Sequence, residues 1–269
     1  MHLSVVIPAH DESGNLPALL KEVRQALLGI YDFEIVVVDD GSTDETPEVL
    51  RTLRLEMPQL RVVRHRNSCG QSTALMTGVA SATAPVIATL DGDGQNDPHD
   101  IPGMLNVLQR SRFTEQCSMV AGFRHQRRDS GWRLFCSKLA NGVRRRILHD
   151  DTPDSGCGIK VFHRSAFLAM PHFNHMHRFL PALIIRSGGR VVSYPVNHRP
   201  RMYGRSHYDT LRRLLNGLMD LAGVAWLLHR TRIPELERMD VEHDQGSSVD
   251  CIRIDGARPV HKPFPRAVA

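Results

Sequence analysis

Short apolar runs alternate with segments of helical periodicity through the first third of the chain. The apolar runs cover Leu3–Ile7, Glu34–Val38, Arg61–His65 and Pro85–Leu90. Between them, hydrophobic residues recur every three or four positions, as on the buried face of a helix. These residues are Leu16, Leu19, Leu20, Val23 and Leu27, then Val49, Leu50 and Leu53, then Ala74, Leu75, Gly78 and Val79. Strands that alternate with helices predict an α/β fold with a doubly wound, mostly parallel sheet.

Each apolar run ends in a polar loop, and these loops cover residues 9–15, 39–44, 66–71 and 91–95. Because the carboxyl ends of parallel strands meet at one edge of a sheet, the four loops are expected to lie together, where α/β proteins bind their ligands. Ser42 and Glu45 also have the spacing of a capping box for the second helix.

The fourth loop reads Asp91-Gly92-Asp93-Gly94-Gln95. Its two carboxylates and one amide stand at alternate positions after a strand, a spacing that can turn three oxygens toward one point. Oxygen ligands suit Mg²⁺ or Mn²⁺, ions that usually bridge phosphates in such sites. From this segment alone, a metal site and a solvated Asp-Gly turn stay equally open.

Composition sets broad limits. The 269 residues are 41% hydrophobic and 23% charged, which is typical of a globular protein. No apolar run reaches the roughly 18 residues of a membrane-spanning helix, and no signal peptide precedes Leu3. The five cysteines lack CxxC spacing and predict reduced thiols in the cytosol, where Cys69 and Cys157 are expected to be small filler residues.

Two other kinds of site fit less well. Phosphatases of the Asp-x-Asp type carry their motif after the first strand and have Thr or Val where Gln95 stands. A dinucleotide site needs Gly-x-Gly-x-x-Gly after the first strand, and none follows Ile7.

Four motifs in order resemble family-2 glycosyltransferases, and most closely the branch that transfers sugars to polyprenyl phosphates, as dolichyl-phosphate mannose synthase does. They are Val5–Ala9 with Glu12 and Asn15, Val36–Asp44, Arg66-Asn67 with Gly70, and Asp91–Gln95. The resemblance covers roughly residues 3–230. It implies a single GT-A domain, a Rossmann-like fold of nucleotide-diphospho-sugar transferases, followed by an amphipathic helix.

The resemblance also implies roles for particular residues. Nucleotide-sugar binding is expected from Pro8, Ala9, Glu12, Asp39, Asp40, Asn67, Gly70 and Asp91. A Mg²⁺ or Mn²⁺ ion is expected on Asp91, Asp93 and Gln95, where it would neutralise the diphosphate leaving group. Without the resemblance, Glu12 reads as a favourable charge at the start of a helix.

The second half of the chain is rich in arginine. A fifth strand is expected at Val120–Arg124, and Asp154–Gly158 resembles the family's acidic loop at the active site. The segment His198–Ser206 resembles the part of the polyprenyl-phosphate branch that closes over the diphosphate. Acceptor phosphate binding is expected from Arg124, Arg133, Arg201 and Ser206, whereas Arg144–Arg146 are expected on a solvated or membrane-facing surface. The catalytic residues are expected to be Asp93, Asp154 and Arg201.

The arginines help to indicate the chemical class of the acceptor. A sugar hydroxyl needs a general base, whereas a lipid phosphate is already an anion and needs positioning and charge neutralisation. The arginine-rich half therefore favours a phosphate nucleophile. A role of Asp154 as a general base stays open.

Tyr208–Arg230 is strongly apolar, with arginines near both ends. Asn216 and Asp220 interrupt it, so an interfacial helix fits better than a membrane span. Packing on the core or on a second subunit stays open. The net charge of +5 and pI near 9.2 agree with anionic lipid headgroups, and no nucleic-acid motif accompanies them.

The expected organisation is a GT-A domain over 1–207, with a nucleotide half at 1–97 and an acceptor half at 98–207. An amphipathic helix at 208–233 and a flexible tail at 234–269, with one possible strand at Cys251–Ile254, would follow.

The predicted function is a metal-dependent, inverting glycosyltransferase that uses a UDP- or GDP-sugar and a polyprenyl phosphate. It would lie at the cytoplasmic face of the membrane, as a peripheral enzyme, an oligomer or the partner of a membrane protein. A relative acting on a saccharide hydroxyl in cell-envelope polysaccharide synthesis is the enzymatic alternative. A binding module without turnover and a membrane-associated scaffold are the non-enzymatic ones.

Overall fold

The computed structural model of the chain describes residues 2–114, 117–124, 142, 144–148, 150–201, 203 and 210–230. Within these residues the four predicted N-terminal strands form as β1 (His2–Ala9), β2 (Asp32–Asp39), β3 (Leu60–Arg64) and β4 (Val86–Thr89). The three predicted helices lie between them as α1 (Leu16–Leu27), α2 (Thr46–Glu56) and α3 (Gln71–Ser81). The hydrophobic pattern placed the four strands and α1 within two residues of their observed ends. Its repeating residues in α2 and α3 begin three residues after the first residue of each helix and stop three and two residues before the last.

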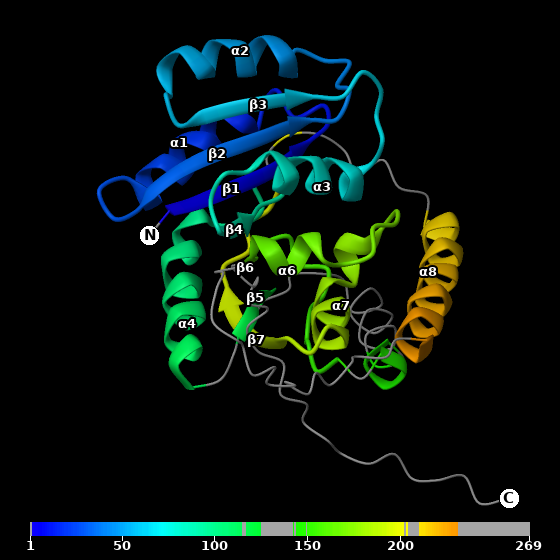
Figure 1. Cartoon of the computed structure of the whole chain (residues 1–269). Coiled ribbons are helices and arrows are strands. Elements are labelled where there is room, and N and C mark those ends of the chain that lie inside the picture. Colours follow the sequence, from blue (N-terminus) through cyan, green and yellow to red (C-terminus); the bar gives the residue numbers. More distant parts are fainter. Residues whose placement is uncertain are drawn as a thin grey trace, which may run out of the picture.

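The described residues of the second half add three strands and several helices (Figure 1). The strands are β5 (Cys117–Arg124), β6 (Lys160–His163) and β7 (Arg190–Val196). The helices are η1 (Pro98–Asp100), α4 (Ile101–Thr114), α6 (Arg164–Leu168), η2 (Met176–Arg178), α7 (Leu180–Arg186) and α8 (Thr210–Arg230).

The described strands form one seven-stranded sheet in the order β3-β2-β1-β4-β6-β5-β7. Neighbours pair in parallel except that β6 is antiparallel to both β4 and β5. The mostly parallel α/β sheet predicted from the sequence is confirmed. Because β6 runs the other way, its first residue lies at the edge where the other strands end.

Helices cover both faces of the sheet. One core cluster contains Leu3, Val5 and Ile7 of β1 together with buried residues of α1, α2 and α4. The other contains Val6, Val36 and Val38 with residues of α3, α6, α7 and α8. Alternate side chains of β1 thus point to opposite layers, as the two-residue period of a strand requires.

Gly78 lets α3 lie close to the centre of the sheet. A Cβ at this position would be 2.4 Å from Cγ1 of Val6 and 3.1 Å from Cγ2 of Val38. The small residue therefore sets the distance between α3 and β1, and with it the position of the loop that precedes α3.

The predicted capping box of the second helix is wrong. Helix α2 begins after Glu45, and the side chain of this N-cap residue makes no capping hydrogen bond. The Ser42 hydroxyl instead accepts from the Asp11 backbone N–H at 3.0 Å, and Asp44 accepts from the Thr46 N–H at 2.9 Å. Ser42 lies too far before the helix to cap it and joins two sheet-edge loops.

Helix α8 lies at the periphery of the molecule, on the side of α3 and α7 (Figure 1). None of the described helices combines the length and the hydrophobicity needed to cross a bilayer. The tail at 234–269, with its possible strand at Cys251–Ile254, lies outside the described residues.

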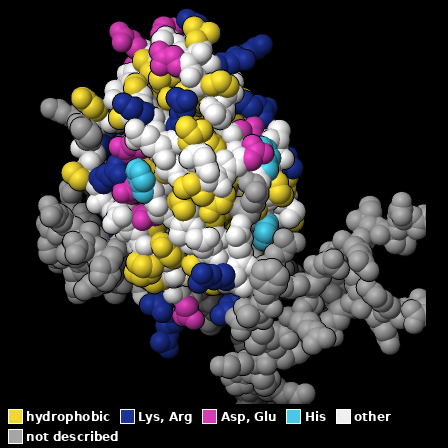
Figure 2. All heavy atoms as spheres, turned by 90° about the vertical axis from the view of Figure 1, so that its left-hand side faces the viewer, with side chains coloured by type: hydrophobic (Ala, Val, Ile, Leu, Met, Phe, Trp, Pro, Cys, Tyr) yellow, Lys and Arg dark blue, Asp and Glu magenta, His cyan; other side chains and the backbone are white. Residues whose placement is uncertain are grey.

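Charged side chains of both signs are dispersed over the face that Figure 2 presents, on the side of α4, rather than gathered into one cluster. Among the described residues of this face, the basic side chains form no continuous surface of the kind that binds nucleic acid.

Candidate active site

The loops after β1, β2, β3 and β4 lie at the carboxyl edge of the sheet, because these four strands are parallel. The antiparallel β6 brings Lys160 and the preceding 154–158 loop to the same edge. The end of β5 supplies Arg124. The topology therefore collects residues from both halves of the chain.

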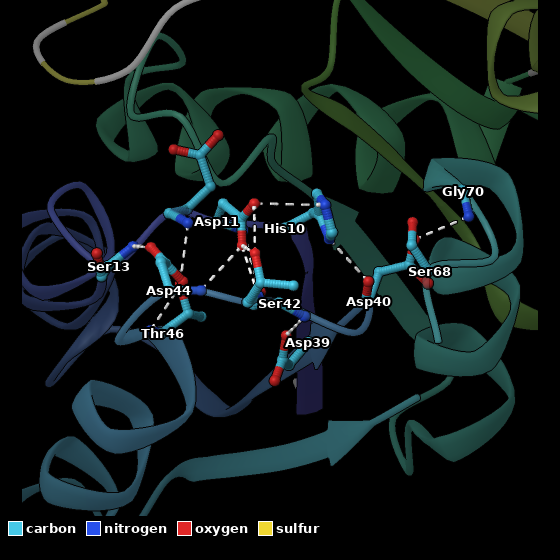
Figure 3. A network of polar contacts seen from close by, with 12 residues as sticks. His10, Asp11, Ser13, Asp39, Asp40, Ser42, Asp44, Thr46, Ser68 and Gly70 are labelled. Carbon is cyan, nitrogen blue, oxygen red and sulfur yellow. Dashed lines mark hydrogen bonds and ion pairs between the residues drawn. The ribbon is translucent and has the colours of Figure 1, made fainter. Parts of the chain in front are cut away.

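The loops after β1 and β2 are joined by a polar network around Asp11 (Figure 3). Asp11 has a φ of 53°, a left-handed conformation that is uncommon without glycine. Its carboxylate accepts from the backbone N–H of Thr43 at 2.7 Å and of Asp44 at 3.3 Å. The Ser13 N–H donates to Asp44 at 3.2 Å. These contacts hold Pro8, Ala9 and Glu12 at a set distance from β2.

Asp39 and Asp40 are both buried, at 1% and 3% exposure. Asp39 accepts from the Ser42 N–H at 2.9 Å, and the Arg64 guanidinium lies 3.0 Å from its other oxygen. Asp40 accepts from the N–H groups of Cys69 (2.9 Å) and Gly70 (2.8 Å). Both side chains therefore shape the loops, whatever else they contact.

Two further groups hold Asp40. The Ser68 hydroxyl donates to it at 2.9 Å, and Nδ1 of His65 lies 2.7 Å from its other oxygen. Although burial opposes ionisation, hydrogen bonds from Cys69, His65, Gly70 and Ser68 outweigh it and hold the pKa of Asp40 below its usual value. His65 is a neighbour that the sequence did not reveal.

The loop after β3 places Asn67 and Gly70 differently. Asn67 is exposed, and its backbone lies against Gly41, where a Cβ would be 2.6 Å from the Asn67 carbonyl carbon. Gly70 has a φ of 90° and precedes α3 directly. Glycine is favoured there because side chains rarely adopt this conformation.

Asp91 and Asp93 follow β4 and lie close together. Burial and the neighbouring Asp93 carboxylate raise the pKa of Asp91 to about 6, against the opposing charges of Lys160 and Arg124. Gln71 donates from Nε2 to Asp91 at 2.8 Å, and the Gln95 N–H donates to Asp93 at 3.1 Å. This pair is a concentrated negative charge at the end of a central strand.

Gln95 contacts a segment that is distant in the sequence. Its Nε2 lies 3.4 Å from the backbone oxygen of Arg199. The amide thus spans from the Asp93 turn to the 197–201 segment. Its role as a metal ligand stays a prediction.

Several groups that the sequence analysis did not select hold Asp91 in place. Asn96 accepts from the Asp91 N–H at 3.3 Å. A Cβ on Gly158 would lie 2.1 Å from Oδ2 of Asp91, so only glycine fits beside this carboxylate. The Gly158 carbonyl in turn accepts from the Thr89 hydroxyl at 2.7 Å.

Lys160 lies in the site, although the sequence analysis did not select it. It is 4% exposed, and its ammonium donates to the Cys157 carbonyl. Burial lowers the pKa of Lys160, while Cys157, Asp91 and Asp154 oppose that shift. A lysine inside the apolar run Ile159–Phe162 was the available signal, since a buried lysine usually has an anionic neighbour.

Arg201 and Glu12 meet across a long sequence separation. Nη2 of Arg201 donates to Glu12 at 2.5 Å, and Asn15 donates to the other Glu12 oxygen at 2.6 Å. Burial raises the pKa of Glu12, and the charge of Asp93 adds to this effect against Asn15 and Arg201. The predicted nucleotide loop and the predicted phosphate-binding segment are therefore in direct contact.

Arg124 and Asp154 form a two-pronged ion pair. Nε and Nη2 of Arg124 donate to the two oxygens of Asp154 at 2.6 and 2.9 Å. Both residues lie near Lys160, whose pKa they influence. The residue expected to bind phosphate and the residue left open as a base are thus each other's partners.

Arg199 fastens the 197–201 segment to the first half of the chain. Its guanidinium contacts Glu22 at 2.6 Å and Asp97 at 2.7 Å, and its N–H donates to the Gln95 carbonyl at 2.9 Å. The sequence placed this segment near the diphosphate but did not identify Arg199 as its anchor.

Two expected site residues, Arg133 and Ser206, lie outside the described residues.

The expectation that Arg144 lies on a solvated or membrane-facing surface is wrong. Arg144 is 6% exposed, lies 3.0 Å from Asp150 and donates to the Thr152 carbonyl at 2.6 Å. Arg145 and Arg146 are exposed as expected. A buried acidic partner at Asp150 keeps Arg144 inside.

Residues 4–169 match the family model described as glycosyl transferase family 2. The chain is 32% identical over 236 residues to dodecaprenyl-phosphate galacturonate synthase of Rhizobium johnstonii, covering 85% of this chain and 68% of that protein. It is 34% identical over 223 residues to undecaprenyl-phosphate 4-deoxy-4-formamido-L-arabinose transferase of Edwardsiella ictaluri, covering 81% and 66%. The chain spans about two thirds of the length of these relatives.

Solved structures share the fold. A mannosyltransferase from Pyrobaculum calidifontis, in complex with GDP-Man and Mn²⁺, superimposes with a TM-score of 0.65 at 19% identity, over 86% of this chain and 65% of that one. Glucosyl-3-phosphoglycerate synthase from Mycobacterium tuberculosis, in complex with Mg²⁺ and UDP, gives 0.62 at 19% identity, over 87% and 80%. The predicted GT-A architecture is confirmed.

The relatives also bear out the resemblance to the polyprenyl-phosphate branch that the motifs indicated. Family model, relatives and sheet topology agree with one another. The chain belongs to glycosyl transferase family 2 and is a glycosyltransferase.

Proposed function

We propose that this chain transfers a sugar from a UDP- or GDP-sugar to a polyprenyl phosphate, with inversion at the anomeric carbon. An oxygen of the lipid phosphate attacks that carbon, and its bond to the nucleoside diphosphate breaks. One observation carries the proposal: the carboxylates of Asp91 and Asp93 share a sheet edge with Arg124 and Arg201. The acceptor class follows from the names of the relatives, which are synthases and transferases of polyprenyl phosphates.

The carboxylate pair suits a divalent cation. Burial, and after it the charge of Asp93, raises the pKa of Asp91 to about 6, and a bound cation would offset both effects by stabilising the charged carboxylates. Asp91, Asp93 and Gln95 would hold Mg²⁺ or Mn²⁺, which when bound would neutralise the leaving diphosphate as a Lewis acid. The oxygen-only donor set favours these ions over softer metals.

The donor would lie along the loops after β1, β2 and β3. Pro8, Ala9 and Glu12 would line it from β1, while Asn67 and Gly70 would approach it from the loop before α3. Asp40 would act by holding that loop, since four groups of residues 65–70 already bond to its carboxylate. Asp39 would act in the same way, through Ser42 and Arg64.

The state of Asp154 supports a phosphate acceptor over a saccharide hydroxyl. A hydroxyl acceptor would need a free base, and both oxygens of Asp154 accept from Arg124. A phosphate acceptor needs no deprotonation and benefits from cations such as Arg124 and Arg201. Asp154 would then orient Arg124, and Arg201 would exchange Glu12 for a phosphate oxygen.

Helix α8 would contact the lipid surface. Leu218, Met219 and Trp226 are 54%, 74% and 62% exposed, and Ala222 and Gly223 are exposed beside them. Val224, on the opposite side, is buried. An apolar face with an exposed tryptophan and a terminal Arg230 is typical of interfacial helices. This contact would make the enzyme peripheral to the membrane, and the cytoplasmic face is part of the proposal.

The test measures release of nucleoside diphosphate from a panel of UDP- and GDP-sugars. Each donor is supplied with Mn²⁺, Mg²⁺ or EDTA, with and without undecaprenyl phosphate in detergent. Release that requires both metal and lipid phosphate is expected with one donor. The glycolipid product then identifies the sugar.

Two results would overturn the assignment. Turnover on a saccharide without lipid phosphate would support the assignment of the donor but show that the acceptor is a saccharide hydroxyl. Donor-independent lipid binding with no turnover under any condition would favour a scaffold.

A further inference from the structure

The first turn of α3 is a junction between three segments. The Gly70 N–H donates to Asp40 at the end of β2, at 2.8 Å. Gln71 donates to Asp91 after β4, also at 2.8 Å. The Ser72 hydroxyl lies 2.8 Å from Nδ1 of His177 and accepts from the His177 N–H at 3.3 Å. A shift of this turn would therefore move the Gln71 amide relative to Asp91.

The 174–177 segment continues from this junction to α8. Nδ1 of His175 lies 2.8 Å from Oδ2 of Asp220, in the middle of α8. On the other side, Asn174 faces Gly70, where a Cβ would be 3.5 Å from the Asn174 side-chain oxygen. The segment thus contacts α8 through His175 and the first turn of α3 through Asn174 and His177 on either side of it.

His175 adopts a strained conformation. Its φ of 65° lies in the left-handed region, which residues other than glycine rarely occupy. Such strain persists where surrounding contacts hold it and is common in segments that switch. The surrounding contacts here include the N–H donation of His175 to Asn174 at 2.9 Å and the Asp220 pair. Loss of the Asp220 contact would favour relaxation of this backbone.

The described side chains of α8 also include apolar residues that pack on the core. Val224 is buried in the core cluster that also contains Leu75 and Val79 of α3, and Leu221, Ala225, Leu227 and Leu228 are partly buried against it. Apolar contacts are not directional, so they leave α8 freer to slide than the His175–Asp220 bond does.

We propose that His175 and His177 are positioning residues that couple α8 to the donor site, so that docking of α8 on a lipid surface strengthens binding of the nucleotide. The inference rests on the lipid contact proposed above for α8. A lipid surface would favour the position of α8 in which Asp220 meets His175. Ser72 would then hold the α3 turn, and Gln71 would hold Asp91. A ligand shifts an equilibrium only by favouring one state, and docking supplies that difference.

The test compares nucleotide binding with and without vesicles. The dissociation constants of UDP and GDP are measured with Mn²⁺, in buffer and on phosphatidylglycerol–phosphatidylcholine vesicles that lack polyprenyl phosphate. For the unmodified chain, vesicles are expected to lower the dissociation constant of the preferred nucleotide about fivefold or more, the usual lower range of allosteric coupling.

Three variants locate the coupling. Asp220→Ala removes the α8 end of the link and leaves the exposed apolar face intact, and Ser72→Ala removes the α3 end. Both are expected to bind vesicles like the unmodified chain, yet to show less than a twofold vesicle effect. Asp32→Ala is the matched control, because it breaks another His–Asp pair, with His2 at 3.0 Å, at the opposite edge of the sheet. It should keep the full effect.

The possible results are distinct. A full vesicle effect in Asp220→Ala or Ser72→Ala would overturn the coupling, as would no effect in an unmodified chain that binds vesicles. Failure of the unmodified chain to bind vesicles would overturn it too, while turnover in detergent would leave the proposed function standing. If Asp220→Ala is poorly folded, Asp220→Asn, which can still hydrogen-bond, and His175→Asn, which tolerates the left-handed region, should keep part of the effect. Loss of the effect in both of these folded variants would count against the proposal.

Discussion

At the scale of single residues, the site depends on small groups that hold Asp91. Gln71 and Asn96 each bond to Asp91, and Gly158 leaves room for its carboxylate. Asp93, by contrast, is partly exposed and accepts a hydrogen bond from the backbone N–H of Gln95, two residues later. Substitution of Asp93 should therefore disturb chemistry more than folding.

Asp93→Ala is expected to abolish metal-dependent release of nucleoside diphosphate while the melting temperature stays within about 2 °C, since surface substitutions usually change stability by less than about 0.5 kcal/mol. Turnover and thermal unfolding of the purified variant check this. Turnover that survives the substitution would remove Asp93 from the metal site.

Gly158→Ala is expected to reduce turnover about 100-fold, the usual effect of displacing a reacting group by about 1 Å. The new Cβ would lie 2.1 Å from Oδ2 of Asp91 and 2.7 Å from Oδ1 of Asn96, so Asp91 must move. Gly156→Ala is the matched control in the same loop, because its Cβ would meet nothing closer than 3.8 Å. Equal rates for both variants would contradict the argument.

At the scale of elements, the position of α3 affects both the stability of the fold and the geometry of the site. It packs on β1 through Gly78 and begins at the turn that contacts Asp40, Asp91 and His177. A helix held so close to a central strand transmits its position to the loops at its start. Changes in the packing of α3 are therefore expected to alter both stability and site geometry.

Gly78→Ala is expected to destabilise the fold by about 1–2 kcal/mol. Alanine would gain up to about 1 kcal/mol of helix propensity, but overpacking a buried contact costs typically 1–3 kcal/mol, and the 2.4 Å overlap is with Val6 in a central strand. Urea unfolding measures the difference. Gly223→Ala in α8, where nothing lies within 4 Å of the new Cβ, should be neutral or stabilising; a similar loss there would contradict the packing explanation.

At the scale of the whole molecule, the amino edge of the sheet is fastened by a buried carboxylate. Glu34 accepts from Ser4 (2.6 Å), Thr83 (2.6 and 2.7 Å) and Arg61 (2.8 Å). Burial opposes ionisation of Glu34, but these hydrogen bonds outweigh it and lower its pKa from 4.5 to about 2. The charged form therefore joins β1, β2 and β3 to the segment before β4.

This contribution to stability is complete above pH 4.5 and is lost as the pH falls toward 2, because the unfolded chain takes up the proton first. A shift of this size corresponds to roughly 3 kcal/mol. Glu34→Gln is expected to lower the free energy of unfolding at pH 7 and to flatten its decline between pH 4.5 and 2. Urea unfolding at pH 7, 4 and 2.5 checks this. Parallel pH curves for both chains would exclude the linkage.

Much of the fold could be read from local pattern. The strands β1 to β4 and the helices between them follow from hydrophobic period and from polar residues at strand ends, which depend on near neighbours in the chain. The carboxylates at Asp91 and Asp93 were found in the same way. Their position after a strand is a local property, and the parallel topology carries it to the ligand-binding edge.

Other features arise only from contacts between distant segments. The reversal of β6 brings Lys160 and Gly158 to Asp91, the fold pairs Arg124 with Asp154 and Arg201 with Glu12, and a buried Asp150 draws Arg144 inward. Partners separated by up to 189 positions leave no period or motif in the chain. The sequence by itself determined the family, the sheet and the loops that carry the chemistry. The tertiary structure decided which charges meet, because pairing depends on distance in space and on burial, and neither is a property of neighbouring residues.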